Sequence, residues 1–221
     1  MSSSARKGEK SRFEALIVDF GGVLTTPMQD AMVRFADELG IELQDLVRAA
    51  LGAYSGGEDR LVVDFETGRI SEEEFALAFA HRLESSTGRP VDPEGLVGRI
   101  FRLEIEESMM DLVGAARASG YRTALCSNSW GTRLYPRDRL GPIFDVIVIS
   151  GEVGLRKPDR AIFELTTDKL GVAPEACVFV DDHPGHLSAA LEVGMTTVLH
   201  RTPDQSIAEV SRLLDLPTSP T

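Results

Sequence analysis

Apolar positions along the chain follow two different periods, and the change from one to the other divides the sequence. The first run, Ala15-Leu16-Ile17-Val18, is continuous and stops at Asp19. A continuous apolar run that contains β-branched residues is typical of a strand buried on both faces of a sheet. Ligands bind outside the carboxyl ends of the strands in open parallel sheets. We therefore expect Asp19 to lie at a functional edge.

Residues 28–107 have helical periodicity and almost no strand signal. Apolar residues recur there at spacings of three and four, as at Phe75 and Phe79. Ser71 and Glu74 have the spacing of a capping box, which predicts the start of a helix. We predict that this region is a helical domain inserted after the first strand.

The rest of the chain alternates between strand and helix patterns. Apolar runs lie at residues 121–126, 144–149, 176–180 and 196–199, and helical segments lie near residues 159–170, 185–193 and 204–214. Such alternation predicts parallel βαβ units in a doubly wound sheet. The expected fold is α/β, with a core domain formed by residues 13–27 and 108–216 and a helical cap domain formed by residues 28–107.

The composition narrows the range of possible functions. Of the 221 residues, 43% are hydrophobic and 26% are charged, as in an ordinary globular protein. The net charge of −12 argues against general binding to nucleic acids, which depends on clustered lysine and arginine. No run approaches the ~18 apolar residues that a membrane span requires. A small phosphorylated substrate is compatible with this charge, because its pocket needs only one or two basic residues.

The N-terminal segment and the two cysteines indicate a cytoplasmic protein. Residues 1–12 are rich in serine and lysine and lack an apolar stretch, which predicts a disordered tail rather than a signal peptide. Cys126 and Cys177 each lie in an apolar run, so we expect buried free thiols in a reducing compartment. The sequence is compatible with a monomer or a homodimer.

Polar residues follow four of the predicted strands. They are Asp19 after the first, Ser127, Asn128 and Ser129 after the second, Arg156 and Lys157 after the third, and Asp181, Asp182 and His183 after the fourth. Parallel strands end at one edge of a sheet, so these side chains are expected to converge. Carboxylate oxygens are preferred ligands of Mg²⁺, while lysine, hydroxyl and amide groups suit a phosphoryl group. One carboxylate can then attack phosphorus and form an aspartyl-phosphate.

The ordered set of these segments resembles the haloacid dehalogenase superfamily of hydrolases, in the phosphatase-like subfamily with a helical cap of the C1 type. The four motifs of the family are matched by residues 17–24, 125–129, 156–159 and 178–182. The resemblance covers residues 13–214. It implies a Rossmann-like core, dependence on Mg²⁺ and hydrolysis of a small phosphorylated metabolite.

The resemblance also implies a role for each matched residue. Asp19 would be the nucleophile. Ser127 and Asn128 would bind the phosphoryl group, which Lys157 would stabilise during catalysis. The implied Mg²⁺ ligands are Asp19, the backbone carbonyl of Gly21, Asp182, and Asp181 through a water.

Gly21 departs from the family pattern, because family phosphatases usually carry a second aspartate there that protonates the leaving group. General acid–base catalysis typically contributes roughly 10²- to 10⁴-fold in rate. We therefore expect slow turnover, or a preference for leaving groups that need little protonation. The neighbouring Gly22 is expected to supply a positive φ in a tight loop.

Two histidines stand near the fourth motif, and His186 occupies a position where many relatives have Asn or Asp. An imidazole titrates near neutrality, so either histidine could replace the missing acid/base. A packing role at the start of a helix is the simpler interpretation for both. We hypothesise a modest catalytic part for His183 alone.

The favoured function is a Mg²⁺-dependent phosphatase whose substrate binds between the sheet edge and the cap. Candidate contacts to the leaving group are Tyr54, Arg60 and Arg69, with Trp130 at the entrance. One alternative is a dehalogenase-type hydrolase in which Asp19 attacks carbon without a metal, although the adjacent acids after the fourth strand speak against it. The other is a non-catalytic phosphate-binding or regulatory protein that lost acid/base function at Gly21.

Overall fold

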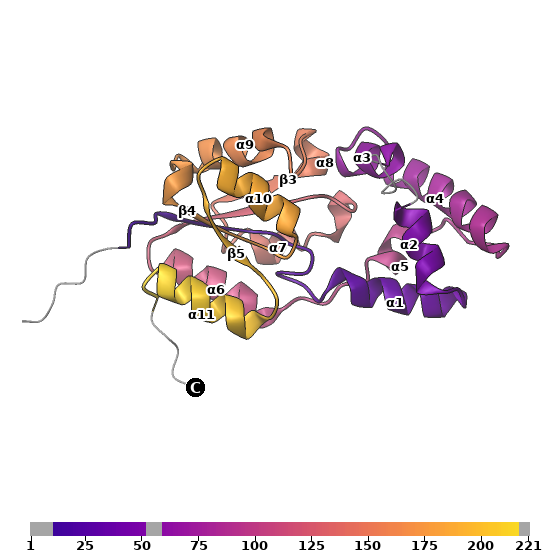
Figure 1. The fold of residues 1–221 in the computed structure, drawn as a ribbon, viewed down its shortest axis with the longest axis horizontal. Helices are drawn as coiled ribbons and strands as arrows, with labels where there is room; N and C mark the ends of the chain where they lie inside the picture. The colour runs from indigo at the N-terminus through magenta and orange to yellow at the C-terminus, as the bar shows by residue number, and fades with distance from the viewer. Residues whose placement is uncertain (1–10, 52–58, 217–221) are drawn as a thin grey trace, which may run out of the picture.

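A five-stranded parallel sheet forms the centre of the molecule (Figure 1). The computed structural model describes residues 11–51 and 59–216. The strands are β1 (Ala15–Val18), β2 (Arg122–Ser127), β3 (Val146–Ile149), β4 (Cys177–Asp181) and β5 (Thr196–Leu199). Their order across the sheet is β3-β2-β1-β4-β5, and each neighbouring pair is parallel. The predicted α/β fold with a doubly wound sheet is confirmed.

Helices cover both faces of this sheet. They are α6 (Glu107–Ala118), α7 (Arg137–Leu140), α8 (Ser150–Val153), α9 (Arg160–Leu170), α10 (Pro184–Glu192) and α11 (Pro203–Leu213). Figure 1 shows α9 and α10 on one side of the strands and α6 and α11 on the other. Leu16 and Val18 of β1 belong to the hydrophobic cluster of α6 and α11, whereas Ala15 and Ile17 belong to that of α9 and α10. Burial on both faces explains why the first run is apolar at every position.

Six helices of the described residues lie between β1 and β2 in the sequence, and we call the first five the helical insert. They are α1 (Met28–Leu39), α2 (Leu43–Leu51), α3 (Arg60–Glu66), α4 (Glu72–Thr87) and α5 (Leu96–Ile100). The insert has its own hydrophobic cluster, in which Phe75 stacks on Phe65 at 4.1 Å and on Phe79 at 5.3 Å between ring centroids. The predicted capping box of Ser71 and Glu74 starts α4.

Two kinds of contact fix the insert against the sheet. The segment that leaves the core and the segment that re-enters it lie side by side, joined by an antiparallel bridge between Thr25 and Ile105. Farther along, Gly68 approaches Gly151 so closely that a Cβ on Gly68 would lie 2.3 Å from the carbonyl oxygen of Gly151. Gly68 also has a φ of +69°, so only glycine fits there. These contacts hold the insert near the carboxyl ends of the strands.

Several other expectations can be compared with the structure. Cys126 and Cys177 are buried and free, as predicted. No described helix is both long and apolar enough to cross a membrane. Most of the predicted N-terminal tail lies outside the described residues, as do Tyr54 and residues 217–221.

Candidate active site

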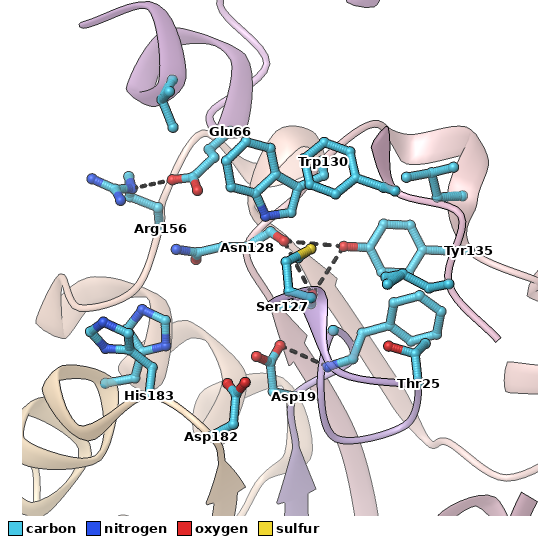
Figure 2. Close-up of a pocket in the computed structure, with 18 of the residues that line it drawn as sticks. Asp19, Thr25, Glu66, Ser127, Asn128, Trp130, Tyr135, Arg156, Asp182 and His183 are labelled. Atoms are coloured by element: carbon cyan, nitrogen blue, oxygen red, sulfur yellow. Dashed lines mark hydrogen bonds and ion pairs between the residues drawn. The ribbon is translucent and has the colours of Figure 1, made fainter. Parts of the chain in front are cut away.

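Asp19 lies directly beyond β1, at the floor of a pocket (Figure 2). The residue is only 7% exposed. Its Oδ1 accepts a hydrogen bond from the backbone N–H of Phe20 at 2.7 Å and lies 2.9 Å from Nζ of Lys157. One carboxylate oxygen is therefore held by two donors, which fixes the direction of the other.

The loop after Asp19 depends on Gly22. This residue has a φ of +76°, and a Cβ on it would lie 2.4 Å from Oδ2 of Asp182. The expected positive φ is confirmed, and the close approach brings the first and fourth motifs together. Gly21 differs, because its φ is outside the left-handed region and a Cβ there would meet only Cε of Met28, at 3.3 Å. Gly21 lines the pocket without offering a side chain.

Lys157 is fully buried between two carboxylates. Its Nζ lies 2.6 Å from Oδ2 of Asp181 and 2.9 Å from Oδ1 of Asp19. Burial alone favours the neutral amine, but Asp181 and Asp19 raise the pKa of Lys157 above its ordinary value. Burial alone would raise the pKa of Asp181, yet Lys157 and His186 hold it well below its ordinary value. The lysine and Asp181 are therefore both charged at neutral pH.

Asp182 adds a third carboxylate to this cluster, and Figure 2 shows it beside Asp19. Desolvation raises the pKa of Asp182 to about 6, with further contributions from the negative charges of Asp19 and Asp181. Three carboxylates thus lie in this cluster, and the ammonium group of Lys157 contacts two of them, Asp19 and Asp181. A divalent cation would relieve the repulsion that remains.

The carboxyl end of β2 and the residue after it provide a hydroxyl and hold the backbone of Lys157 in place. Oδ1 of Asn128 accepts from the backbone N–H of Lys157 at 2.8 Å, and its Nδ2 donates to the carbonyl of Lys157 at 2.9 Å. The side-chain amide of Asn128, which was predicted to bind a phosphoryl group, is thus hydrogen-bonded to the backbone of Lys157 in the third motif. Oγ of Ser127 is 3.0 Å from the hydroxyl oxygen of Tyr135. Ser127 and Asn128 both line the pocket, as expected.

The two histidines have different partners. His183 is the N-cap of α10, and its Nδ1 accepts a hydrogen bond from the backbone N–H of Gly185 at 3.1 Å. Nδ1 of His186 lies 3.1 Å from Oδ1 of Asp181. Both rings line the pocket. The helix-start interpretation is confirmed for His183, and its modest catalytic part stays a prediction.

The insert and the core share a buried ion pair at the pocket wall. Nε of Arg156 lies 2.7 Å from Oε2 of Glu66 on α3, and both side chains are at most 10% exposed. The hydroxyl of Ser150 donates to the carbonyl of Glu66 and reinforces this contact. Sequence reasoning missed Glu66, because an acidic residue inside a helical region carries no distinctive spacing. Tyr135 was missed because it lies in the connection after β2, outside the four motifs.

The pocket has a volume of about 760 Å³, within the usual range for small-molecule sites. Trp130 lines it, as predicted. Arg60 and Arg69 do not, and the expectation that they contact the leaving group was wrong. Both arginines form ion pairs with Asp64, which keeps them on the surface of the insert.

The sequence of this chain is similar to a known family and to several known proteins. The family model of haloacid dehalogenase-like hydrolases matches residues 13–194. Acyl-CoA dehydrogenase family member 10 of Mus musculus is 29% identical over 216 residues, which are 93% of this chain and 19% of that protein. Flavin mononucleotide hydrolase 1 of Arabidopsis thaliana is 28% identical over 154 residues, which are 68% of this chain and 61% of that protein. The chain spans less than two thirds of the length of either relative.

A solved structure supports the assignment of the fold. A HAD family enzyme from Bacteroides thetaiotaomicron, solved in complex with magnesium and inorganic phosphate, has a TM-score of 0.65 to this chain. The two are 21% identical, and the match covers 86% of this chain and 94% of that chain. At this level of identity the likeness shows the fold alone.

Proposed function

We propose that this chain, which belongs to the haloacid dehalogenase-like hydrolases, is a Mg²⁺-dependent phosphatase that forms an aspartyl-phosphate on Asp19. One observation carries the proposal. Asp19 lies almost buried at the pocket floor, with one oxygen held by Lys157 and the N–H of Phe20. Its other oxygen is thereby positioned to attack a phosphorus atom in the pocket.

The residues present fit a magnesium ion. We propose that Asp19, the carbonyl of Gly21 and Asp182 would hold it, with Asp181 acting through a water. Hard oxygen donors of this kind suit Mg²⁺, which when bound would neutralise charge on the phosphoryl oxygens. The Bacteroides enzyme with magnesium and phosphate supports this choice by its similar fold.

A different set of possible ligands is also close together. Asp19, Asp181 and His186 place one ligand atom each within 4.8 Å of one another. Nδ1 of His186 already contacts both carboxylate oxygens of Asp181. Because Mg²⁺ prefers oxygen to imidazole nitrogen, we assign His186 to the orientation of Asp181 instead.

The protein residues would divide the reaction between them. The free oxygen of Asp19 bonds to phosphorus while the bond from phosphorus to the leaving oxygen breaks. The Lys157 ammonium and the Ser127 hydroxyl stabilise the charge on the transferring group. Water then cleaves the acyl phosphate, which releases phosphate and restores Asp19. The helical insert would act as a cap (residues 28–107) on the core (residues 13–27 and 108–216) and exclude bulk water from these steps.

Phosphate release from a panel of phosphate monoesters tests the proposal. We expect activity that requires Mg²⁺, is abolished by EDTA, and falls at least about 10³-fold in Asp19→Asn, which keeps the shape of the side chain. Activity that survives either EDTA or this substitution would contradict it. Chloride release from a 2-haloacid without Mg²⁺ would favour the dehalogenase-type alternative. Binding of phosphate without any turnover would favour the non-catalytic one.

A further inference from the structure

The pocket is much larger than a phosphoryl group requires. Its phosphoryl end, at Asp19 and Ser127, occupies only the floor of a cavity of about 760 Å³. Pockets of 300–1,000 Å³ typically enclose whole small molecules. The remaining space must therefore receive the leaving group, and the walls of that space decide which alcohols fit.

These walls are mostly apolar. The helical insert contributes Val62, Val63 and Phe101, and the core contributes Phe20, Trp130 and Leu134. Trp130 of the core and Phe101 of the insert pack directly on each other, with ring centroids 4.6 Å apart and planes inclined by 32°, and form one aromatic patch in the wall. Figure 2 shows the indole of Trp130 lying over the phosphoryl end. Such a surface favours a flat apolar group that can stack on an aromatic ring.

Several polar side chains in the described part of these walls already have partners. Asp59 pairs with Arg82 and caps α3, while Glu66 pairs with Arg156. The hydroxyl of Tyr135 contacts Ser127. Arg102 also lines the pocket, and it is exposed to solvent, which screens its charge. Among the described residues of these walls, the hydroxyls of a sugar would find few partners, and each buried group left unpaired costs roughly tenfold to a hundredfold in affinity.

The pocket also offers little help to a poor leaving group. Gly21 lies beside Asp19 and has no side chain to donate a proton. Of the other groups in the described part of the lining, Asp59 and Glu66 are held in ion pairs, and Nδ1 of His183 accepts a hydrogen bond from Gly185, which leaves its Nε2 for the modest part predicted above. Phenols are much stronger acids than aliphatic alcohols, so a phenolate departs without prior protonation.

From these observations we propose that the substrates are phosphate monoesters of apolar aromatic alcohols, a class that we call aryl phosphates. The inference rests on the proposed phosphatase function. An oxygen of Asp19 bonds to phosphorus, and the bond from phosphorus to the aryl oxygen breaks with its electron pair on the phenolate. The phenolate takes a proton from water. A second water hydrolyses the aspartyl-phosphate to phosphate and free Asp19.

A matched substrate panel tests this class. With Mg²⁺ present, kcat/KM is measured for phenyl phosphate, 2-naphthyl phosphate, cyclohexyl phosphate and glucose 6-phosphate. We expect about a tenfold rise from phenyl to naphthyl, whose leaving groups are similarly acidic, because the second ring fills the apolar space. We expect at least about a hundredfold preference for naphthyl phosphate over the hexose phosphate. Inhibition by an arylmethyl phosphonate and a hexose phosphonate, which cannot be hydrolysed, separates binding from the intrinsic reactivity of the esters.

The outcomes distinguish the two proposals. No turnover of any ester would contradict the phosphatase function itself. Turnover with a preference for the hexose ester, or equal values for phenyl and naphthyl phosphate, would contradict only the substrate class.

Variants locate the preference in the pocket wall. Trp130→Ala should lower kcat/KM for 2-naphthyl phosphate by at least about tenfold, mainly through KM, and lower that for glucose 6-phosphate much less. Leu77→Ala is the matched control, because Leu77 lies on α4 with 60% of its side chain exposed and should leave both values unchanged. Val63→Thr keeps the shape of a half-buried wall residue and should also reduce the aryl preference. Equal losses for both esters in Trp130→Ala would overturn the inference.

Discussion

The two ends of the pocket are built by different kinds of interaction. At the sheet edge, buried charges contact one another: Lys157 joins Asp19 to Asp181, and Asn128 holds the backbone of Lys157. Above that edge, the insert and the loop after β2 enclose an apolar space in whose wall Trp130 packs on Phe101. The floor is ordered by charge and hydrogen bonds, whereas the walls are ordered by packing.

This difference has a consequence for mutation. Polar groups at the floor depend on one another, because a buried charge that loses its partner is costly. Apolar wall residues act more independently, and their replacement changes the fit of a ligand by modest steps. We therefore expect substitutions at the floor to abolish activity and substitutions in the walls to alter which ester is preferred.

The largest effect is expected from Lys157→Met. The methionine has a similar length but leaves Asp19 and Asp181 without their shared cation, so the free energy of unfolding should fall by about 3–5 kcal/mol. Turnover should fall by at least about 10³-fold. Denaturant titration and phosphate release measure the two effects. Lys169→Met, at an exposed position on α9, is the control, and an equal loss of stability in that variant would contradict the account.

Gly21→Asp should improve the poorer substrates. The backbone at this position accepts a side chain, and the nearest obstacle is the flexible end of Met28. A carboxyl group there could protonate the leaving oxygen, so kcat for cyclohexyl phosphate should rise by about 10- to 100-fold and kcat for naphthyl phosphate by much less. A parallel increase for both esters, or none, would show that protonation of the leaving group does not limit the reaction.

Gly22→Ala should destabilise the loop that Gly21→Ala leaves intact. At Gly22 the positive φ disfavours a side chain and the Cβ would collide with Asp182, so the free energy of unfolding should fall by about 1–3 kcal/mol. Gly21→Ala requires only a small shift of Met28 and should change stability by less than about 1 kcal/mol. Thermal or chemical unfolding of the two variants provides the comparison. Equal losses would mean that the approach to Asp182 is unimportant.

The smallest effect is expected at the amino ends of the strands, in Asp145→Asn. Burial alone would raise the pKa of Asp145, but hydrogen bonds from Thr123 and Arg117 and the charge of Arg122 hold it below its ordinary value. The stabilisation is therefore complete above the ordinary carboxyl pKa of about 4 and is lost as the pH falls through the lowered pKa. At pH 7 the free energy of unfolding of the wild type should exceed that of the variant by about 1 kcal/mol, and this difference should be lost below about pH 4. Unchanged turnover at pH 7 would show that this end of the sheet does not contribute to catalysis.

The sequence predicted the floor of the pocket far better than its walls. Polar residues that follow apolar runs mark strand ends, and parallel strands bring such ends together, so Asp19 and Lys157 were expected at one site, while their roles came from the resemblance to the family motifs. No comparable rule relates a helix of the insert to a strand end. The pair of Glu66 and Arg156 depends on how α3 lies against the core, and Arg60 and Arg69 were chosen wrongly because their charge did not reveal their partner, Asp64. The domain boundaries, the cytoplasmic location and the oligomeric state stay predictions.

The central claim is that Asp19 carries the phosphoryl group during turnover, and trapping this intermediate tests it most directly. Enzyme incubated with 2-naphthyl phosphate and Mg²⁺ is quenched in acid, digested and examined by mass spectrometry. The account predicts that the peptide containing Asp19 gains the mass of one phosphoryl group, and that Asp19→Asn shows no such gain. A phosphoryl group on another residue, or full turnover in Asp19→Asn, would contradict it.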